Sequence, residues 1–302
     1  MSSGVSPWRL ALIRLTGSGL ALAAAALLAC LLIGALGAPL VAAVLGVDPQ
    51  AIDLLARFQP PSAAHPLGTD ELGRDLLVRL LYGGRVSLLV GLFGALGAAL
   101  IGTLVGVVAG YAGGRLDAFL MRLTDAVVAL PLLPLLILLA ALDLQKLGLS
   151  AAAAGAESVS LYRIALIVAL FGWTTVARLV RGATLSLRER DFIAAARVLG
   201  VPYRRIIAVH VLPNVLGPVV VASTLAVGNV ILLESVLSFL GLGVQPPLAS
   251  WGNMLSNAQE LLWSAPRLAI LPGLMIFLTV IGFNFLGDRL QDALDPRALE
   301  GP

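Results

Sequence analysis

The sequence predicts an all-α membrane protein whose chain crosses a lipid bilayer six times. Of its 302 residues, 59% are hydrophobic and only 12% are charged, whereas soluble proteins carry about a quarter charged residues. The mean hydropathy is +0.98. Several runs also exceed the ~18 mostly apolar residues that indicate a membrane-spanning helix. These observations predict a multi-pass bundle of helices.

Six apolar segments are predicted to span the membrane. Each approaches the ~20 residues that a helix needs to cross a ~30 Å hydrocarbon core. They lie near residues 18–46, 86–110, 125–143, 161–181, 214–240 and 268–287. The second contains small residues, which let helices approach closely in lipid. Its glycines therefore predict a tightly packed helix in preference to a pore-lining one: Gly91, Gly94, Gly97, Gly102 and Gly106.

The first segment is predicted to be a retained membrane anchor. It is too long for a signal peptide, and the apolar sequence continues through residues 35–41, beyond any small-residue cleavage site. Cys30, the only cysteine of the chain, lies within this segment and has no partner for a disulfide. We interpret Cys30 as a small residue that faces lipid or a neighbouring helix.

The distribution of Lys and Arg predicts that both termini are cytoplasmic. Short cytoplasmic loops retain positive residues, and this orientation places 13 of the 20 Lys and Arg residues inside. Seven of them are arginines between Arg178 and Arg205. The stretch between the fourth and fifth spans is therefore predicted to face the cytosol.

A long connection on the opposite side, residues 47–85, is rich in proline. After Gly68, either Thr69 or Asp70 could cap a short helix whose leucines recur at helical spacing. Asp75 and Arg79 are placed four residues apart. We predict an amphipathic helix that lies along the membrane interface, which fits this pattern better than a seventh span.

A second connection on that side, residues 241–266, contains two tryptophans. Trp251 and Trp263 are typical of a membrane boundary, where amphipathic rings lie between lipid and water. This segment is predicted to stay at the extracytoplasmic surface.

Several function classes are excluded by motifs that the sequence lacks. It has no phosphate-binding G-x-x-x-x-G-K-[ST] loop, no His/Cys cluster with metal spacing and no nucleophile–base arrangement of a hydrolase. His65 and His210 are predicted on opposite sides of the membrane, which argues against a shared metal or catalytic pair. We therefore expect no catalytic residue, metal site or cofactor on this chain. The net charge of +3 gives no indication of nucleic-acid binding.

Three polar residues are predicted at membrane depth or at its edges. Asp125 opens the third span, Glu234 lies late in the fifth, and Asn284 lies late in the sixth. Ionisable groups are costly in lipid, so these positions are candidate functional residues. Glu234 has two interpretations: a hydrogen bond or ion pair that joins neighbouring helices, or a place on a substrate path.

Residues 186–213 are predicted to form two short helices joined by a sharp bend. Gly200 suits the left-handed residue that ends the first helix, Pro202 suits the first position of the second, and Pro213 should stop the second. Small side chains on the first helix would let another protein approach closely, and arginines at its flanks could pair with acids of a partner or with lipid headgroups. One face of this helix should hold Phe192, Ala195, Ala196 and Leu199.

This stretch resembles the cytoplasmic loop of inner-membrane permeases of ATP-binding-cassette importers, here the C-type permease of the dipeptide/oligopeptide/nickel family. That loop carries the EAA motif, E-A-A-x3-G-x9-I-x-L-P, and the nine-residue spacer is intact in this chain. The matching positions are Ala194, Ala195, Ala196, Gly200, His210, Leu212 and Pro213. Two positions depart from the motif. Ala194 replaces the acid and so removes a carboxylate that could pair with the ATPase, and His210 replaces the isoleucine.

The resemblance extends over roughly residues 65–298. It is carried by "HPLGTDELGRDLLVRLLYGGRVSLLVG", "LSFLGLGVQPPLASWGNML" and "PGLMIFLTVIGFNFLGDRLQDALDPR". Residues 1–64, with an N-terminal cytoplasmic tail, the first span and the start of the external loop, match only in having one anchor. We therefore expect a permease domain at 65–298, with its coupling loop at about 186–213, in the type I importer fold that the resemblance implies.

The resemblance implies a transport subunit without chemistry of its own. Such permeases pair two homologous membrane subunits, usually as a heterodimer, around a central pathway. They dock two ATPase subunits that hold ATP and Mg²⁺, and an extracytoplasmic binding protein delivers the substrate. The implied location is the plasma (inner) membrane of a bacterium or archaeon. The residues expected to dock the ATPase are Asp191, Phe192, Ala194, Ala195, Ala196, Arg197, Gly200, His210, Leu212 and Pro213.

The substrate is open at this stage. Permeases with nearly the same motifs move dipeptides, longer peptides, nickel chelates and other small solutes, and the lack of a metal-binding cluster favours peptides over nickel. A secondary transporter driven by an ion gradient is an alternative of another class, but the spans lack coupling carboxylates and an evident inverted repeat. A purely structural membrane subunit would leave the docking loop unexplained.

Overall fold

The computed structural model describes residues 7–142, 145–146, 148, 150 and 157–294. Over these residues the chain is mainly helical. The α-helices are α1 (Pro7–Gly17), α2 (Gly19–Leu36), α3 (Ala38–Leu45), α4 (Leu76–Ala112), α5 (Gly114–Ala129), α6 (Leu132–Ala140), α8 (Glu157–Arg188), α9 (Asp191–Val198), α10 (Tyr203–Ile206), α11 (Leu212–Phe239), α12 (Ala258–Leu261) and α13 (Arg267–Leu294). Short 3-10 turns occur at Leu54–Ala56 and Asn253–Leu255, and a π turn at Ile207–Val211.

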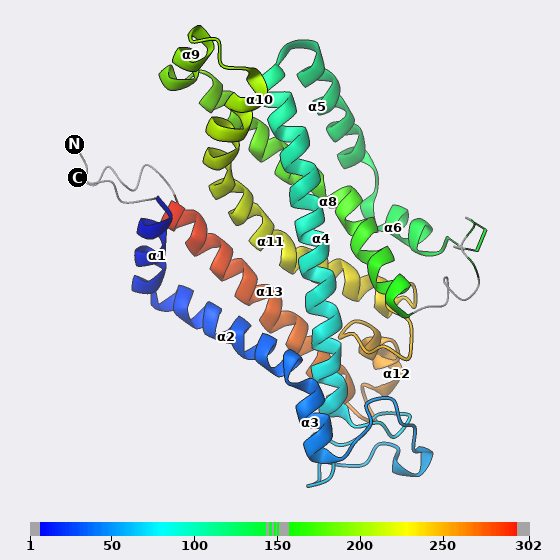
Figure 1. Ribbon diagram of the computed structural model, residues 1–302. Helices are drawn as coiled ribbons and strands as arrows, with labels where there is room; N and C mark the ends of the chain where they lie inside the picture. Colours follow the sequence, from blue (N-terminus) through cyan, green and yellow to red (C-terminus); the bar gives the residue numbers. More distant parts are fainter. Residues whose placement is uncertain (1–6, 143–144, 147, 149, 151–156, 295–302) are drawn as a thin grey trace.

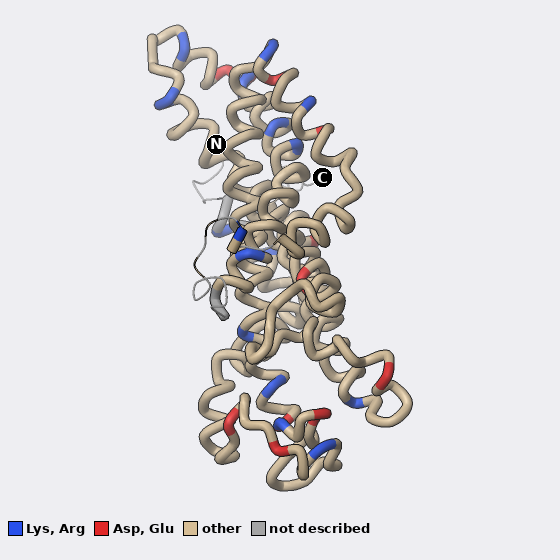
Figure 2. The backbone as a smooth tube through the Cα atoms, turned by 90° about the vertical axis from the view of Figure 1, so that its right-hand side faces the viewer, with Lys and Arg blue, Asp and Glu red and all other residues tan. Residues whose placement is uncertain are grey.

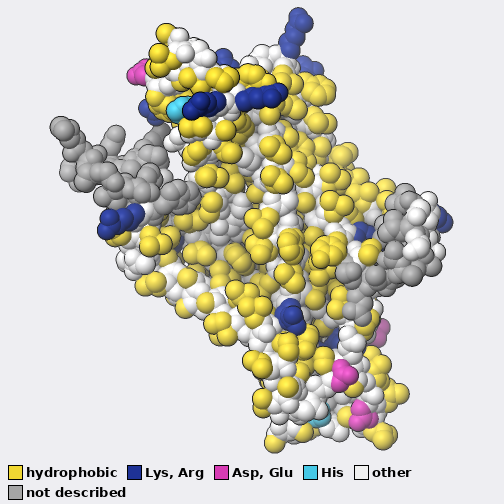
Figure 3. All heavy atoms as spheres, viewed as in Figure 1, with side chains coloured by type: hydrophobic (Ala, Val, Ile, Leu, Met, Phe, Trp, Pro, Cys, Tyr) yellow, Lys and Arg dark blue, Asp and Glu magenta, His cyan; other side chains and the backbone are white. Residues whose placement is uncertain are grey.

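The described helices confirm the predicted all-α membrane fold. Five of them, namely α2, α4, α8, α10 joined to α11, and α13, are long and apolar enough to cross a membrane, and α5 with α6 makes a sixth span if this bent pair is counted as one. α9 lies at one end of the bundle and α3 and α12 at the other (Figure 1). Basic residues predominate at the α9 end, whereas acidic and basic residues alternate at the opposite end (Figure 2). Hydrophobic side chains cover the long side between the two ends (Figure 3).

The contact between α4 and α8 is the centre of the bundle. Several glycines of α4 lie so close to α8 that a side chain would not fit. A Cβ atom on Gly102 would lie 2.6 Å from the carbonyl oxygen of Trp173, and one on Gly106 would lie 2.6 Å from that of Ala177. The prediction of a tightly packed second span is therefore confirmed. α11 packs against both helices, and α13 and α2 extend the bundle on its other side (Figure 1).

The predicted interfacial helix near residues 70–81 is wrong. Asp75 caps this helix instead of Thr69 or Asp70, and α4 then continues unbroken for 37 residues. Leu76 is only 1% exposed, and the indole nitrogen of Trp251 donates to the carbonyl oxygen of Leu80 at 2.9 Å. The regularly spaced leucines therefore mark a face that another part of the same chain covers, and not a face that lies in lipid.

The third span is bent, although the apolar run at 125–143 predicted one straight helix. α5 and α6 meet at 82°. Pro131 lacks an amide hydrogen and disfavours a helical conformation of the residue before it, and Leu130 is accordingly extended, with φ −73° and ψ 139°. α5 is held against α8 by Arg181, whose guanidinium donates to both carboxylate oxygens of Asp117 at 2.5 and 2.6 Å.

The two-helix prediction for residues 186–213 is confirmed at its bend and wrong at its end. Gly200 has φ +74°, the left-handed conformation that glycine adopts without strain. Pro213 does not stop the second helix, because α10 continues through the π turn at Ile207–Val211 into α11. A π turn changes which carbonyls accept hydrogen bonds, so the missing amide of a nearby proline is tolerated. Residues 203–239 thus form one continuous span.

Candidate functional site

The α9 loop, residues 189–202, caps one end of the bundle (Figure 1). Ile193 is 0% and Ala196 7% exposed, and both pack among apolar side chains of α4, α8, α10 and α11. Of the four residues predicted to share one face of this helix, only Ala196 points into the bundle. The other residues between Asp191 and Gly200 are exposed, namely Asp191, Phe192, Ala194, Ala195, Arg197, Val198, Leu199 and Gly200, whereas Val201 is partly buried against the same cluster. The loop is therefore anchored by Ile193, Ala196 and, in part, Val201, and its outer surface is exposed.

An apolar tip follows the last turn of α9. Val198 is 88% and Leu199 81% exposed, although this end of the molecule is rich in charge. Large apolar side chains that project together from a polar surface indicate contact with a partner.

The second half of the motif lies directly beneath α9. His210 is in the π turn, and Leu212 and Pro213 begin α11. The ring of Phe192 lies 6.2 Å from the ring of His210, measured between centroids, and the side-chain amide of Asn214 donates to the carbonyl oxygen of His210 at 2.6 Å. The fold thus brings the two halves of the predicted docking motif to the same end of the bundle.

Arginines surround the base of this loop. The Arg197 guanidinium stacks 5.2 Å from the ring centroid of Tyr111, and Arg188 donates to the Tyr111 carbonyl oxygen at 3.2 Å. These residues, with Ala112 and Tyr203, line a cavity of about 400 Å³. Within the described part of the chain, four arginines of the stretch form no ion pair: Arg190, Arg197, Arg204 and Arg205. These arginines therefore remain available to pair with acidic residues of another molecule.

Asp125 and Asn284 lie on the surface of the chain. Asp125 forms an ion pair with Arg178 at 2.6 Å, with 65% and 47% of the two side chains exposed. Asn284 is exposed on α13. These positions are open to lipid or to another subunit, so their predicted path or packing roles stay predictions.

Glu234 is fully buried, in contrast to the other two polar residues. Each of its carboxylate oxygens accepts a serine hydroxyl: Oε2 from Ser87 at 3.2 Å and Oε1 from Ser238 at 2.7 Å. Ser87 belongs to α4 and Ser238 to α11. The carboxylate therefore joins two spans, as one of the two interpretations predicted, and neither serine residue is more than 1% exposed.

The two serines also hold the segment of residues 241–257, which follows α11. The backbone N–H of Val244 donates to Ser238 Oγ, and that of Trp251 donates to Ser87 Oγ, each at 3.1 Å. The Trp251 ring is seated on glycines of α4, where a Cβ on Gly84 would lie 2.9 Å from Trp251 Cζ2. Glu234 thus fixes this segment onto both helices through two relayed hydrogen bonds.

A network of buried charges at the same end was not foreseen from the sequence. Asp70, 4% exposed, accepts a hydrogen bond from Arg74 Nε at 2.8 Å and forms an ion pair with Arg79 Nε at 3.3 Å. Nearby, His65 Nδ1 lies 2.9 Å from a carboxylate oxygen of Asp75. Among the described residues no group of three His, Cys, Asp or Glu could hold a metal ion. The ion pairs link residues of the connection between α3 and α4 to one another and to Arg79 in the first turn of α4.

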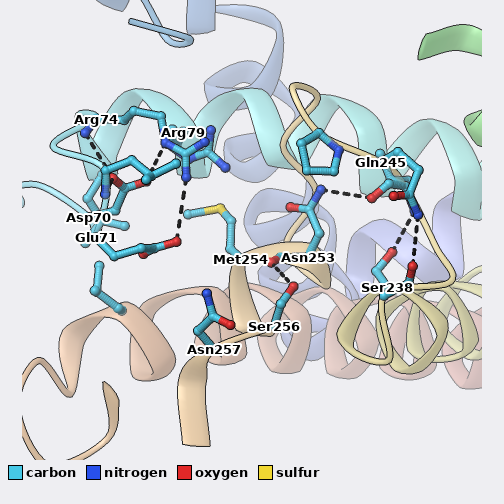
Figure 4. A pocket seen from close by; sticks show the side chains of 16 residues that line it. Asp70, Glu71, Arg74, Arg79, Ser238, Gln245, Asn253, Met254, Ser256 and Asn257 are labelled. Atoms are coloured by element: carbon cyan, nitrogen blue, oxygen red, sulfur yellow. Dashed lines mark hydrogen bonds and ion pairs between the residues drawn. The ribbon is translucent and has the colours of Figure 1, made fainter. Parts of the chain in front are cut away.

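A cavity of about 310 Å³ lies between this network and the 241–257 segment. Figure 4 shows Asp70, Glu71, Arg74 and Arg79 on one side of it and the side chains of Gln245, Asn253 and Ser238 on the other. Asn253 donates to the carbonyl oxygens of Val244 and Leu248, at 3.2 and 2.7 Å, and so shapes the second wall. The only signal in the sequence was the density of Asp, Glu and Arg at 70–79, within the segment that we predicted to be an interfacial helix.

Comparisons with known proteins agree with this architecture. The family model for the binding-protein-dependent transport system inner membrane component matches residues 102–300. The family model for the N-terminal transmembrane domain of oligopeptide transport permease C matches residues 6–61. The chain is 41% identical over 98% of its length to the dipeptide transport system permease protein DppC of Alkalihalophilus pseudofirmus, and covers 91% of that protein.

Two further relatives are oligopeptide transport system permease proteins OppC. The one from Haemophilus influenzae is 46% identical over 77% of this chain and 70% of its own. The one from Bacillus subtilis is 36% identical over 97% and 90%, respectively. In this family ATP is hydrolysed by separate ATPase subunits. The chain belongs to the inner-membrane permease family of binding-protein-dependent ABC importers, with the type I importer fold.

Proposed function

We propose that this chain forms half of the translocation pathway of an ATP-dependent peptide importer. The support for a peptide substrate is that relatives 41% and 46% identical are named for dipeptide and oligopeptide transport. In this proposal the partners are a second homologous permease, two ATPase subunits that hold ATP and Mg²⁺, and an extracytoplasmic binding protein that delivers the peptide.

The α9 end faces the cytosol in this proposal, and both termini are cytoplasmic. Basic residues predominate at the α9 end (Figure 2), and positive residues are retained on the cytoplasmic side of membrane proteins. The segment of residues 241–257 and the network around Asp70 then lie on the extracytoplasmic side, where the binding protein docks.

The observation that carries the docking role is the exposed tip on an anchored loop. Val198 and Leu199 project outward, while Ile193 fixes α9 to the ends of the long helices. A partner that grips the tip therefore moves the helices and not merely the loop. Arginines near the tip that form no ion pair within the described residues favour an ATPase surface with acidic residues. Residue 194, acidic in the family motif, is alanine here, so this loop offers no carboxylate at that position.

Transmission through the membrane follows from the continuity of the two helices that flank the loop. α8 is unbroken from Glu157 to Arg188, and residues 203–239 form one span. Closure of the ATPase pair would draw the docking loops together, and these helices would carry the displacement to the region of Glu234. The loop must contact open and closed ATPase dimers differently for the cycle to drive transport.

The test is replacement of Gly200 by aspartate. An L-residue at φ +74° is strained, and the added carboxylate lies beside the apolar tip. We expect the subunit to insert normally, uptake to be lost, and ATP hydrolysis by the complex to be uncoupled from substrate. Gly182→Asp is the matched control, since Gly182 is exposed on α8 and no atom lies within 4 Å of an added Cβ. Full transport by Gly200→Asp would contradict the docking assignment.

Nickel or another small solute is the second candidate substrate. Copurification of the complex with its binding protein, followed by mass spectrometry and metal analysis of the ligand, distinguishes the two: a peptide supports the proposal and a nickel chelate replaces it. An ion-coupled secondary transporter is the alternative of another class. Uptake that survives ATP depletion but collapses with an ionophore would establish that alternative.

A further inference from the structure

A second cavity at the end of the molecule opposite α9 is lined by two arginines. It measures about 290 Å³ and lies between the start of α4, residues 49–50 after α3, and residues 247–249. None of the described residues that line it is acidic. Arg79 and Arg85 share the lining with Tyr82, Leu89, Pro247 and Leu248. The cavity therefore combines positive charge with apolar walls.

Arg79 is held in place between this cavity and the 310 Å³ cavity, and lines both. Its side chain is only 8% exposed, and its one ion pair joins Nε to Asp70 at 3.3 Å. That oxygen of Asp70 lies closer to Arg74, at 2.8 Å, so Asp70 is shared between two cations. In the described part of the chain no acceptor is found for the two Nη groups of Arg79. These donors are positioned in advance for a planar oxyanion.

Arg85 adds a second cation without a carboxylate partner in the described residues. Its guanidinium lies 5.6 Å from the ring centroid of Tyr82, one turn earlier on α4. Stacking on an aromatic ring orients the guanidinium and leaves its in-plane N–H groups available. Together the two arginines favour an anion over a neutral or cationic group.

The arginines lie at the end of a continuous apolar stripe of α4. The stripe continues from Leu89 at helical spacing to Thr103, where it borders a groove of about 520 Å³ between α4 and α11. Figure 3 shows this side of the molecule, with basic side chains interrupting the hydrophobic surface near the lower end of α4. A solute that enters from the arginine end therefore meets positive charge first and apolar surface afterwards.

We propose that Arg79 and Arg85 form a subsite for the C-terminal carboxylate of the transported peptide, at the extracytoplasmic end of the α4–α11 groove. The inference rests on the proposed function, because every linear peptide with a free C-terminus carries this group. Bidentate guanidinium–carboxylate pairing fixes the end of the peptide, and the residues at 247–249 accommodate an apolar terminal side chain. The phosphate of an anionic lipid headgroup shares the charge and the oxygen geometry, so the experiment separates the two sources.

The first experiment measures uptake in proteoliposomes that contain the whole transporter and its wild-type binding protein. The probes are trialanine and trialanine amide, which differ only at the C-terminus. For Arg85→Gln we expect the KM for trialanine to rise about tenfold, the loss of one charged hydrogen bond, and the KM for the amide to change little. The KM of Arg85→Lys for trialanine should lie between those of the wild type and of Arg85→Gln, because lysine keeps the positive charge but loses the bidentate geometry of the guanidinium.

Arg57→Gln is the matched control. Arg57 lies at the same end of the molecule, is exposed, and stacks on Phe58 at 5.4 Å much as Arg85 stacks on Tyr82. It should leave both KM values unchanged. If Arg85→Gln raises the KM equally for the two peptides, or raises it for neither, the subsite proposal is wrong. A loss that varies with the phosphatidylglycerol content of the liposomes would assign the arginines to a lipid phosphate. Wild-type protein that takes up no peptide at all would instead refute the proposed function.

A second measurement does not depend on transport of the amide. In a Cys30→Ser background, which removes the only native cysteine, Leu248→Cys places a thiol at the cavity. A negatively charged methanethiosulfonate reagent should modify it faster than a positively charged one, and Arg85→Gln should lower that rate ratio about tenfold. Trialanine, but not its amide, should slow the modification. A rate ratio that Arg85→Gln leaves unchanged would overturn the proposal even if the transport data were ambiguous.

Discussion

The two ends of the bundle use their charges in opposite ways. At the α9 end the arginines are largely exposed, four of them have no ion pair in the described residues, and two large apolar side chains project outward. At the opposite end Asp70, Asp75, Arg79 and Glu234 are buried and bonded within the chain. One end leaves its cations exposed to a partner, whereas the other uses most of its buried charges to hold its own segments together. Substitutions should therefore change stability at one end and coupling at the other.

The largest loss of stability is expected for Trp251→Ala. Trp251 is 2% exposed, donates from its indole to Leu80 and is seated on Gly83 and Gly84. Removal of a buried tryptophan costs about 3–5 kcal/mol of unfolding free energy. Trp263→Ala is the control, because Trp263 is 92% exposed. Thermal unfolding of the detergent-solubilised protein should separate the two variants clearly; similar midpoints would show that the 241–257 segment is not part of the core.

The next effect is expected for Asp70→Asn. The change leaves Arg74 and Arg79 without their shared carboxylate in a buried site, which costs about 3 kcal/mol. Asp125→Asn removes a carboxylate from an exposed pair and should cost less than about 1 kcal/mol. If Asp70→Asn and Asp125→Asn lower the free energy of unfolding by the same amount, the contrast between a buried and an exposed end is wrong.

A smaller effect, about 2 kcal/mol, is expected for Glu234→Ala, because two buried serine hydroxyls lose their acceptor. The 241–257 segment should become more accessible to limited proteolysis, and Glu260→Ala, at an exposed position of α12, should not change it. Glu234→Gln sharpens the test, since the amide keeps one acceptor. Normal uptake per inserted Glu234→Gln protein would eliminate the substrate-path interpretation and leave the helix-joining one.

The smallest change in stability, within about 0.5 kcal/mol, is expected for the pair Val198→Ser and Leu199→Ser at the exposed tip. Uptake should nevertheless fall strongly, and the ATPase subunits should dissociate more readily during purification. A tip variant that is unstable but fully coupled would reverse the comparison between the two ends.

Local rules predicted the parts of the fold that depend on neighbouring residues. The apolar segments, the close packing of the α4 glycines and the left-handed Gly200 follow from composition, spacing and backbone sterics. The start of α4, the bend at Pro131 and the continuation through Pro213 were missed. For the start of α4 and the continuation through Pro213, the deciding contact or hydrogen-bond shift was not visible in the local pattern. The bend did have a local signal, because Pro131 disfavours a helical conformation of Leu130.

The polar cores could not be predicted because their partners are far apart in sequence. Ser87 and Glu234 are 147 residues apart, and Leu80 and Trp251 are 171 apart. A serine in an apolar run carries no mark of the carboxylate that it will meet. For the α9 loop the situation is reversed, since its small residues and spacing identified it, and its docking role remains a proposal because it needs a partner chain.

The π turn at Ile207–Val211 helps to set the direction in which the α9 loop points around the axis of α11. Successive residues of an α-helix are offset by about 100° around its axis, and a π turn adds one residue to the count without adding a helical turn. Loss of one residue there would rotate α10 and the loop by about 100° relative to α11, with every loop residue unchanged. The direction in which this subunit presents its loop is therefore a matter of helix phase, separable from what the loop itself contains.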